Sequence, residues 1–294
     1  MNVTMPAVRL FAGNLRPNPA ETIEKGVELG ADPVQQDLFA LSAGVADVKS
    51  ASEFAELGRS KGESSWQKGA YSVAGALTGS PAAGLGLVST VESLFQDPVS
   101  RGFFAVAGSV VGSEELSAIK DITTGYGATP AENGLLGVAA AVAGLEGAQE
   151  AVNIGLAEGK STEEGAYFAL ATALAGGAQG LGSTLDVARD FASSPTLAGP
   201  YAVAAALAGP EDATAALRMA EDLGQTDAEK AMFALVGGLV GAERGPGFVR
   251  MSRALSPTEG QTPAMAVAAA LTAAGTDTSR EAAVAGAVLL GAGP

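Results

Sequence analysis

Three adjacent pairs of acidic residues are the strongest candidates for catalysis: Glu114–Glu115, Glu163–Glu164 and Glu211–Asp212. Two carboxyl groups about 5–10 Å apart can hydrolyse a glycosidic bond. The 294-residue chain has no histidine and no cysteine, which excludes Ser-His-Asp and Cys-His catalysis, zinc sites built on these residues, and disulfide bonds. A carboxylate pair or a Ser-Lys dyad is the catalytic option that remains.

The acidic pairs also have a structural interpretation. All three lie where we expect the first turn of a helix, and acidic residues there stabilise the helix dipole. The segment Gly159–Ser161 resembles the end of a phosphate-binding loop, but Ile154 replaces the first glycine of that motif and a helix precedes it. No spacing of Asp and Glu indicates a Ca²⁺ or Mg²⁺ site. The sequence therefore predicts no enzyme, no metal and no cofactor.

The best candidate for a binding site is a column of polar residues that recurs every 32 or 33 positions. Its predicted binding residues are Glu24, Glu56, Asp121, Asn153, Asp186, Arg218 and Arg250, with Ser89 in the same register. The column is acidic in the first part of the chain and basic at Arg218 and Arg250, with Arg253 nearby. A polar stripe is also expected on any helix that faces water, and the sequence does not separate the two interpretations.

The predicted helices recur at the same interval: the polar column lies on the first helix of each pair, and the second helix is marked by its N-cap. Residues that accept a hydrogen bond at a helix N-terminus recur thirteen positions before an aliphatic residue of each copy. These predicted caps are Asp32, Ser64, Asp97, Thr129, Ser161, Ser194, Thr226 and Thr258. Proline follows four of them, and Gln or Glu stands three positions after six of them. Each cap therefore predicts the start of the second, apolar helix of a helical pair.

Small residues mark two further positions. Glycine stands two residues before five of the caps, including Gly30 and Gly62, where we expect a positive φ that ends the preceding helix. Gly or Ala stands inside the second helix of six copies, including Gly75 and Gly108, where neighbouring helices would approach closely.

These patterns predict an all-α protein: an α-solenoid of about eight helix-turn-helix repeats of 32–33 residues over 17–275. Residues 1–16 form an N-terminal extension, in which Val8, Leu10 and Phe11 could cover the first pair. Residues 276–294 form a C-terminal capping helix that covers the last pair. The repeat length is close to that of tetratricopeptide repeats, but their Trp, Leu-Gly and Tyr signature is absent, so no family is assigned.

Composition limits the partners. With 17 basic and 32 acidic residues the formal charge is −15, and no basic stretch is present, so we expect no nucleic-acid binding. Residues 1–18 lack a signal-peptide pattern, which favours the cytoplasm and leaves export by a non-classical route as the alternative. Segments such as 195–209 and 262–275 are apolar, but a 14-residue helix spans about 21 Å, less than the roughly 30 Å of a bilayer core. Membrane association is therefore disfavoured.

The predicted function is a non-enzymatic scaffold whose polar column binds a protein or peptide. Two alternatives stay open: a membrane-active protein whose apolar helices insert after unstacking, and an enzyme that uses a carboxylate pair. The oligomeric state is not predicted.

Overall fold

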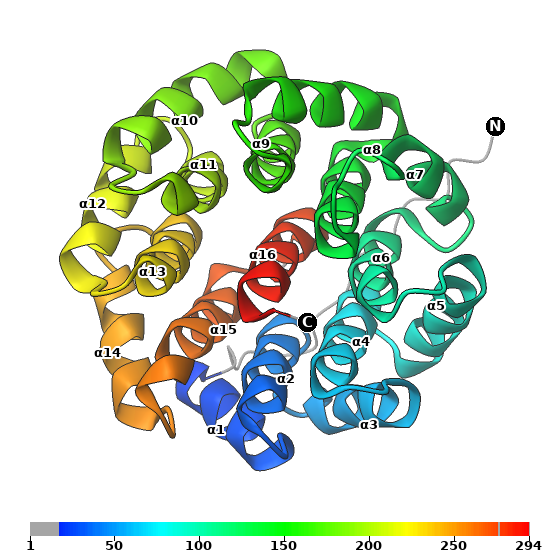
Figure 1. Cartoon of the computed structure of the whole chain (residues 1–294). Coiled ribbons are helices and arrows are strands. Elements are labelled where there is room, and N and C mark those ends of the chain that lie inside the picture. Colours follow the sequence, from blue (N-terminus) through cyan, green and yellow to red (C-terminus); the bar gives the residue numbers. More distant parts are fainter. Residues whose placement is uncertain (1–17, 276, 294) are drawn as a thin grey trace.

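The computed structural model describes residues 18–275 and 277–293, and within these ranges the protein is all-α, as predicted. The predicted extension at 1–16, with Val8, Leu10 and Phe11, lies outside the described residues. Helices alternate along the chain between an outer and an inner layer (Figure 1). The outer helices are α1 (Pro19–Leu29), α3 (Ala51–Lys61), α5 (Pro81–Leu94), α7 (Leu116–Thr123), α10 (Ala178–Phe191), α12 (Ala213–Leu223) and α14 (Gly245–Leu255). The inner helices are α2 (Pro33–Val45), α4 (Ser65–Thr78), α6 (Pro98–Val111), α9 (Thr162–Leu174), α11 (Pro195–Ala208), α13 (Asp227–Val240) and α15 (Thr262–Ala274).

Helix α8 (Pro130–Glu158) belongs to both layers, because it changes direction at Gly144, whose φ of 73° is not helical. Its first half lies among the inner helices, and its second half continues along the outer layer toward α10 (Figure 1). The chain therefore passes from inner to outer layer here through one glycine instead of through a longer turn.

The layers close into a ring (Figure 1). Each inner helix packs against the next inner helix along the chain, from α2 through α15. The last inner helix, α15, then packs against the first, α2, and α1 contacts both α14 and α15. The first and last helical pairs, which the sequence patterns left as two ends, are thus neighbours.

The predicted caps place the inner helices correctly. Seven of the eight residues directly precede an inner helix, and Thr129 forms a complete capping box with Glu132. The exception is Thr258, which precedes the short 3₁₀ helix η1 (Glu259–Gln261), so that α15 starts only at Thr262. The eighth copy therefore departs from the others at its N-terminal end.

The predicted positive φ at the glycines before the caps is wrong. Gly30 and Gly62 have φ values of −81° and −79°, in the extended region. Glycine is needed there for space, because a Cβ on either residue would overlap the backbone of the following inner helix, at Gln36 and Lys68 respectively. Positive φ occurs instead after the inner helices, for example at Gly79.

The small residues inside the inner helices do allow close packing, as predicted. A Cβ on Gly75 would lie 3.2 Å from the Phe54 ring of α3, and one on Gly108 would lie 2.5 Å from Leu87 of α5. Backbones of inner and outer helices therefore approach to a distance that larger residues would prevent.

The C-terminal helix α16 (Thr278–Ala292) does not cover the last pair, which corrects the sequence-based prediction. It lies in the centre of the ring (Figure 1) and packs against α4, α6, α8 and α9, with at most marginal contact to α15. Val284, Val288 and Leu289, the residues predicted to cover the last pair, are at most 1% exposed in this central position. A helix that is apolar on all sides is stable in water only when it is surrounded, and the inner layer surrounds it.

Close packing does not require every helical glycine, and Gly86 is an example. Gly86 lies in the middle of α5, is exposed, and would place a Cβ with no atom within 4 Å. Because alanine has the higher helix propensity, we expect Gly86→Ala to raise the free energy of unfolding by about 0.5–1 kcal/mol. Urea denaturation measures this, and an unchanged or lowered value would contradict the open environment of Gly86.

Candidate functional site

The predicted polar column lies on the outside of the ring. All seven of its residues are exposed, and each comes from a different outer helix or from the outer half of α8. In chain order they are Glu24 on α1, Glu56 on α3, Asp121 on α7, Asn153 on α8, Asp186 on α10, Arg218 on α12 and Arg250 on α14. The ring therefore distributes these side chains around its circumference and does not gather them in one pocket.

Most of the polar column is free of internal partners. Glu56 lies 3.7 Å from Arg59, and the Asn153 carboxamide accepts a hydrogen bond of 3.0 Å from Gln149. The other five side chains form no hydrogen bond or ion pair with any described residue. A partner could therefore contact them without breaking internal interactions.

A second set of charged side chains on the outer helices is structural. Arg59, Lys120, Arg189 and Arg253 each donate a hydrogen bond to a backbone carbonyl at the end of the preceding outer helix. Each cation also lies 5.2–5.7 Å from the centre of a phenylalanine ring. Cations stabilise helix C-termini and aromatic faces attract them. These contacts give Lys120 and Arg253 structural roles that the sequence did not reveal.

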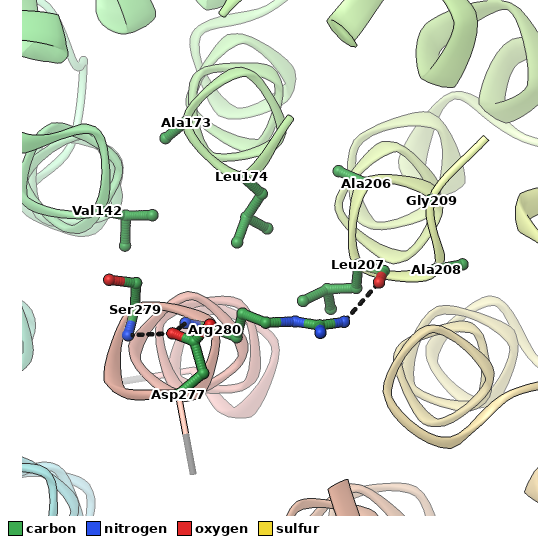
Figure 2. A pocket seen from close by; sticks show the side chains of 10 residues that line it. All are labelled: Val142, Ala173, Leu174, Ala206, Leu207, Ala208, Gly209, Asp277, Ser279 and Arg280. Atoms are coloured by element: carbon green, nitrogen blue, oxygen red, sulfur yellow. Dashed lines mark hydrogen bonds between the residues drawn. The ribbon is translucent and has the colours of Figure 1, made fainter. Parts of the chain in front are cut away.

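One cavity of about 320 Å³ lies where α16 enters the ring (Figure 2). Its walls come from the C-terminal ends of α8's inner half, α9 and α11, with Leu174 and Leu207 among the apolar side chains. Arg280 of α16 extends across to α11 and donates a 2.5 Å hydrogen bond to the Leu207 carbonyl (Figure 2). Asp277 accepts hydrogen bonds from the backbone N–H groups of Ser279 and Arg280. Both charged groups of the cavity are thus used to fix the start of α16.

The opposite end of α16 is fixed by the only tryptophan. Trp66, at the start of α4, is 4% exposed, and its indole N–H donates a 3.1 Å hydrogen bond to the Leu289 carbonyl. Because Leu207 ends an inner helix and Trp66 begins one, α16 runs antiparallel to the inner helices. Antiparallel helix dipoles attract each other, so this direction favours the central position.

The three candidate carboxylate pairs lie at the N-terminal ends of three different helices, α7, α9 and α12. Glu163 and Glu164 lie in the first turn of α9, as predicted, and Glu164 accepts a 2.6 Å hydrogen bond from the Lys160 N–H. The other two pairs are exposed in the turns directly before α7 and α12. None of the six lines the cavity at α16. In the described ranges no three acidic side chains are grouped closely enough to hold a metal ion.

A polar network that sequence reasoning missed joins an inner helix to an outer one. The Tyr201 hydroxyl donates a 2.6 Å hydrogen bond to Glu221, whose carboxylate also lies 2.7 Å from the Lys230 ammonium. Burial acts to raise the pKa of Glu221, but the hydrogen bonds from Lys230 and Tyr201 outweigh it and the pKa is lowered. Burial of the Tyr201 hydroxyl raises the pKa of Tyr201, and its hydrogen bond to Glu221 raises it further. The network is satisfied internally and binds the helices together.

By length and apolar composition, one helix in the described part of the chain could cross a membrane, namely α8. The bend at Gly144 divides it, and 56% of its most apolar window is buried inside the ring.

Comparison of the chain with protein-family models, with curated proteins and with solved structures gives no match. The geometry of the ring and the chemistry of its surfaces therefore carry the functional argument.

Proposed function

We propose that this chain is a non-enzymatic interaction scaffold, built as a closed α-solenoid of eight repeats of 32–33 residues, which binds a protein or peptide through the polar column. Solenoids use extended surfaces made from equivalent positions of successive repeats to bind partners. The one observation that carries the proposal is that all seven residues of the column are exposed on the outer layer and five have no internal partner. The inner layer, by contrast, is covered by α16.

The charges of the column specify the kind of partner. Side chains on α1, α3, α7 and α10 are acidic, whereas Arg218 and Arg250 on α12 and α14 are basic. Because α14 contacts α1, the basic arc is adjacent to Glu24. A partner with a basic segment followed by an acidic one would match this order, and complementary charges speed association and fix orientation. The net charge of −15 disfavours nucleic acid as the partner.

Charge reversal of the acidic arc tests this proposal. We expect Glu24→Lys with Glu56→Lys and Asp121→Lys to abolish capture of partners from the native source. The free energy of unfolding should change by less than about 1 kcal/mol, because exposed charges contribute little to stability. Affinity capture, followed by identification of the retained proteins, measures the first effect, and urea denaturation measures the second.

A control triple variant separates position from net charge. Glu114, Glu211 and Glu243 are exposed, form no hydrogen bond or ion pair with a described residue, and lie in turns outside the polar column. Their replacement by lysine changes the net charge equally and should leave capture intact. Equal capture by both triple variants would rule out the column as the binding surface.

A further inference from the structure

The joint between α15 and α2, which we call the seam, differs from every other joint of the inner layer. Neighbouring inner helices elsewhere are consecutive helical pairs, connected by one outer helix or, for α8 and α9, by the outer half of α8. At the seam only non-covalent contacts join helices from the two ends of the described chain. Opening the ring there breaks no connection of the backbone.

The seam also differs in the residue that each inner helix presents to the inner helix before it. The fifth position after each predicted cap faces the preceding inner helix: a Cβ on Gly69 would overlap Leu38 of α2, and one on Gly134 would lie 2.5 Å from Phe103 of α6. In seven copies this position holds a residue without an ionisable side chain, namely Gly69, Gly102, Gly134, Ala166, Gly199, Ala231 and Pro263. In the first copy it holds Asp37, which faces the last copy across the seam.

Polar groups make up the seam around Asp37. The Gln261 side-chain amide donates to Gln36 at 2.9 Å and to Asp37 at 3.4 Å. Beside the seam, where α15 also contacts α1, the hydroxyl oxygens of Thr22 on α1 and Thr272 on α15 lie 2.9 Å apart. Gln261 ends η1, the turn that distinguishes the eighth copy from the others. The local departure of this copy from the repeat pattern thus coincides with the seam.

Among the described residues, no cation pairs with Asp37 to stabilise its charge. Helix α15 has no ionisable side chain, and Glu259 of η1 is exposed. On the other elements packed against α2, Lys25 of α1 pairs with Glu28, and Arg59 of α3 binds the Leu29 carbonyl. The remaining ionisable groups of those elements form no hydrogen bond or ion pair with Asp37; they are Glu21 and Glu24 on α1, Glu53, Glu56 and Lys61 on α3, Lys68 and Tyr71 on α4, and Arg280 on α16. Glu281 of α16 is acidic and buried, and it has an interaction of its own. Asp32, the N-cap of α2, accepts hydrogen bonds from Ser65 and Gln35.

We propose that the ring opens at the seam when Asp37 loses its proton. Burial raises the pKa of Asp37 to about 7, although the hydrogen bond from Gln261 lowers it in part. In the open ring the carboxyl group is solvated, so its pKa returns toward the ordinary value of 3.8. The closed ring therefore binds the proton more tightly. It is favoured at acidic pH, and its advantage is lost as the pH rises from about 4 to about 7.

Hydrogen exchange of the full-length protein tests this inference. We expect the opening equilibrium of α2 and α15, corrected for the intrinsic pH dependence of exchange, to increase at least about tenfold between pH 5 and pH 8. Helix α9, on another part of the ring, is the internal reference and should show no such increase. Asp37→Asn should abolish the pH dependence, and Asp37→Ala, which introduces the residue present in two other copies, is a second variant without the carboxyl group.

A reversible lock provides the complementary measurement. Because the chain has no cysteine, Thr22→Cys with Thr272→Cys gives one thiol pair that joins α1 to α15, and it links the first and last helical pairs beside the seam. The oxidised form should suppress the exchange of α2 and α15 at both pH values, and reduction should restore it. The inference is overturned if α2 and α15 follow α9 at both pH values, if both Asp37 variants retain the pH dependence, or if the lock changes nothing.

Discussion

Val284→Asp is expected to lower the free energy of unfolding at neutral pH by about 4 kcal/mol or more. Val284 lies in the middle of α16 and is completely buried at the centre of the ring. A carboxyl group there would have its pKa raised by about three units, and each unit costs about 1.4 kcal/mol at a pH where the unfolded chain is ionised. The loss should therefore be smaller at pH 5 than at pH 8, because the buried acid would then be protonated.

The same substitution at an exposed site of α16 is the control. Thr278 begins the helix, and its side chain is exposed. We expect Thr278→Asp to be neutral or slightly stabilising, because an acidic residue in the first turn favours the helix dipole. Urea denaturation of both variants at the two pH values decides the question. If Val284→Asp were as stable as Thr278→Asp, α16 would not occupy the ring as a buried helix.

Local features of this fold could be predicted from the sequence because their causes are local. A cap such as Ser64 accepts a hydrogen bond from Gln67, three residues away, and a proline such as Pro98 fits the first helical turn. The exposure of the polar column also followed from the register, since Glu24 comes directly after the buried Ile23. Helix boundaries and faces are determined over a few residues, and the sequence displays them.

Closure of the ring and the position of α16 could not be predicted in this way. Closure depends on contacts such as the one between Thr22 and Thr272, which are 250 positions apart. It also depends on the small rotation of each helical pair relative to the one before it, which no residue pattern indicates. The sequence contained two signals of these contacts. Asp37 is the only ionisable residue in its column, and Trp66 is the only tryptophan. Their partners, Gln261 and the Leu289 carbonyl, are identified only in the folded chain.

Gly44→Ala is expected to destabilise the ring by about 2 kcal/mol, although alanine is the better helix former. Gly44 lies in α2 on the seam, and a Cβ added there would overlap the carbonyl oxygen of Ala268 in α15. A backbone atom cannot move aside as a flexible side chain does, so the two helices must separate. Gly86→Ala, the same substitution in the open environment of α5, is the matched control and should be stabilising. Opposite signs in urea denaturation, with faster hydrogen exchange of α2 and α15 only in the Gly44 variant, would place the cost at the seam. Equal signs would mean that α2 and α15 do not approach closely enough to close the ring.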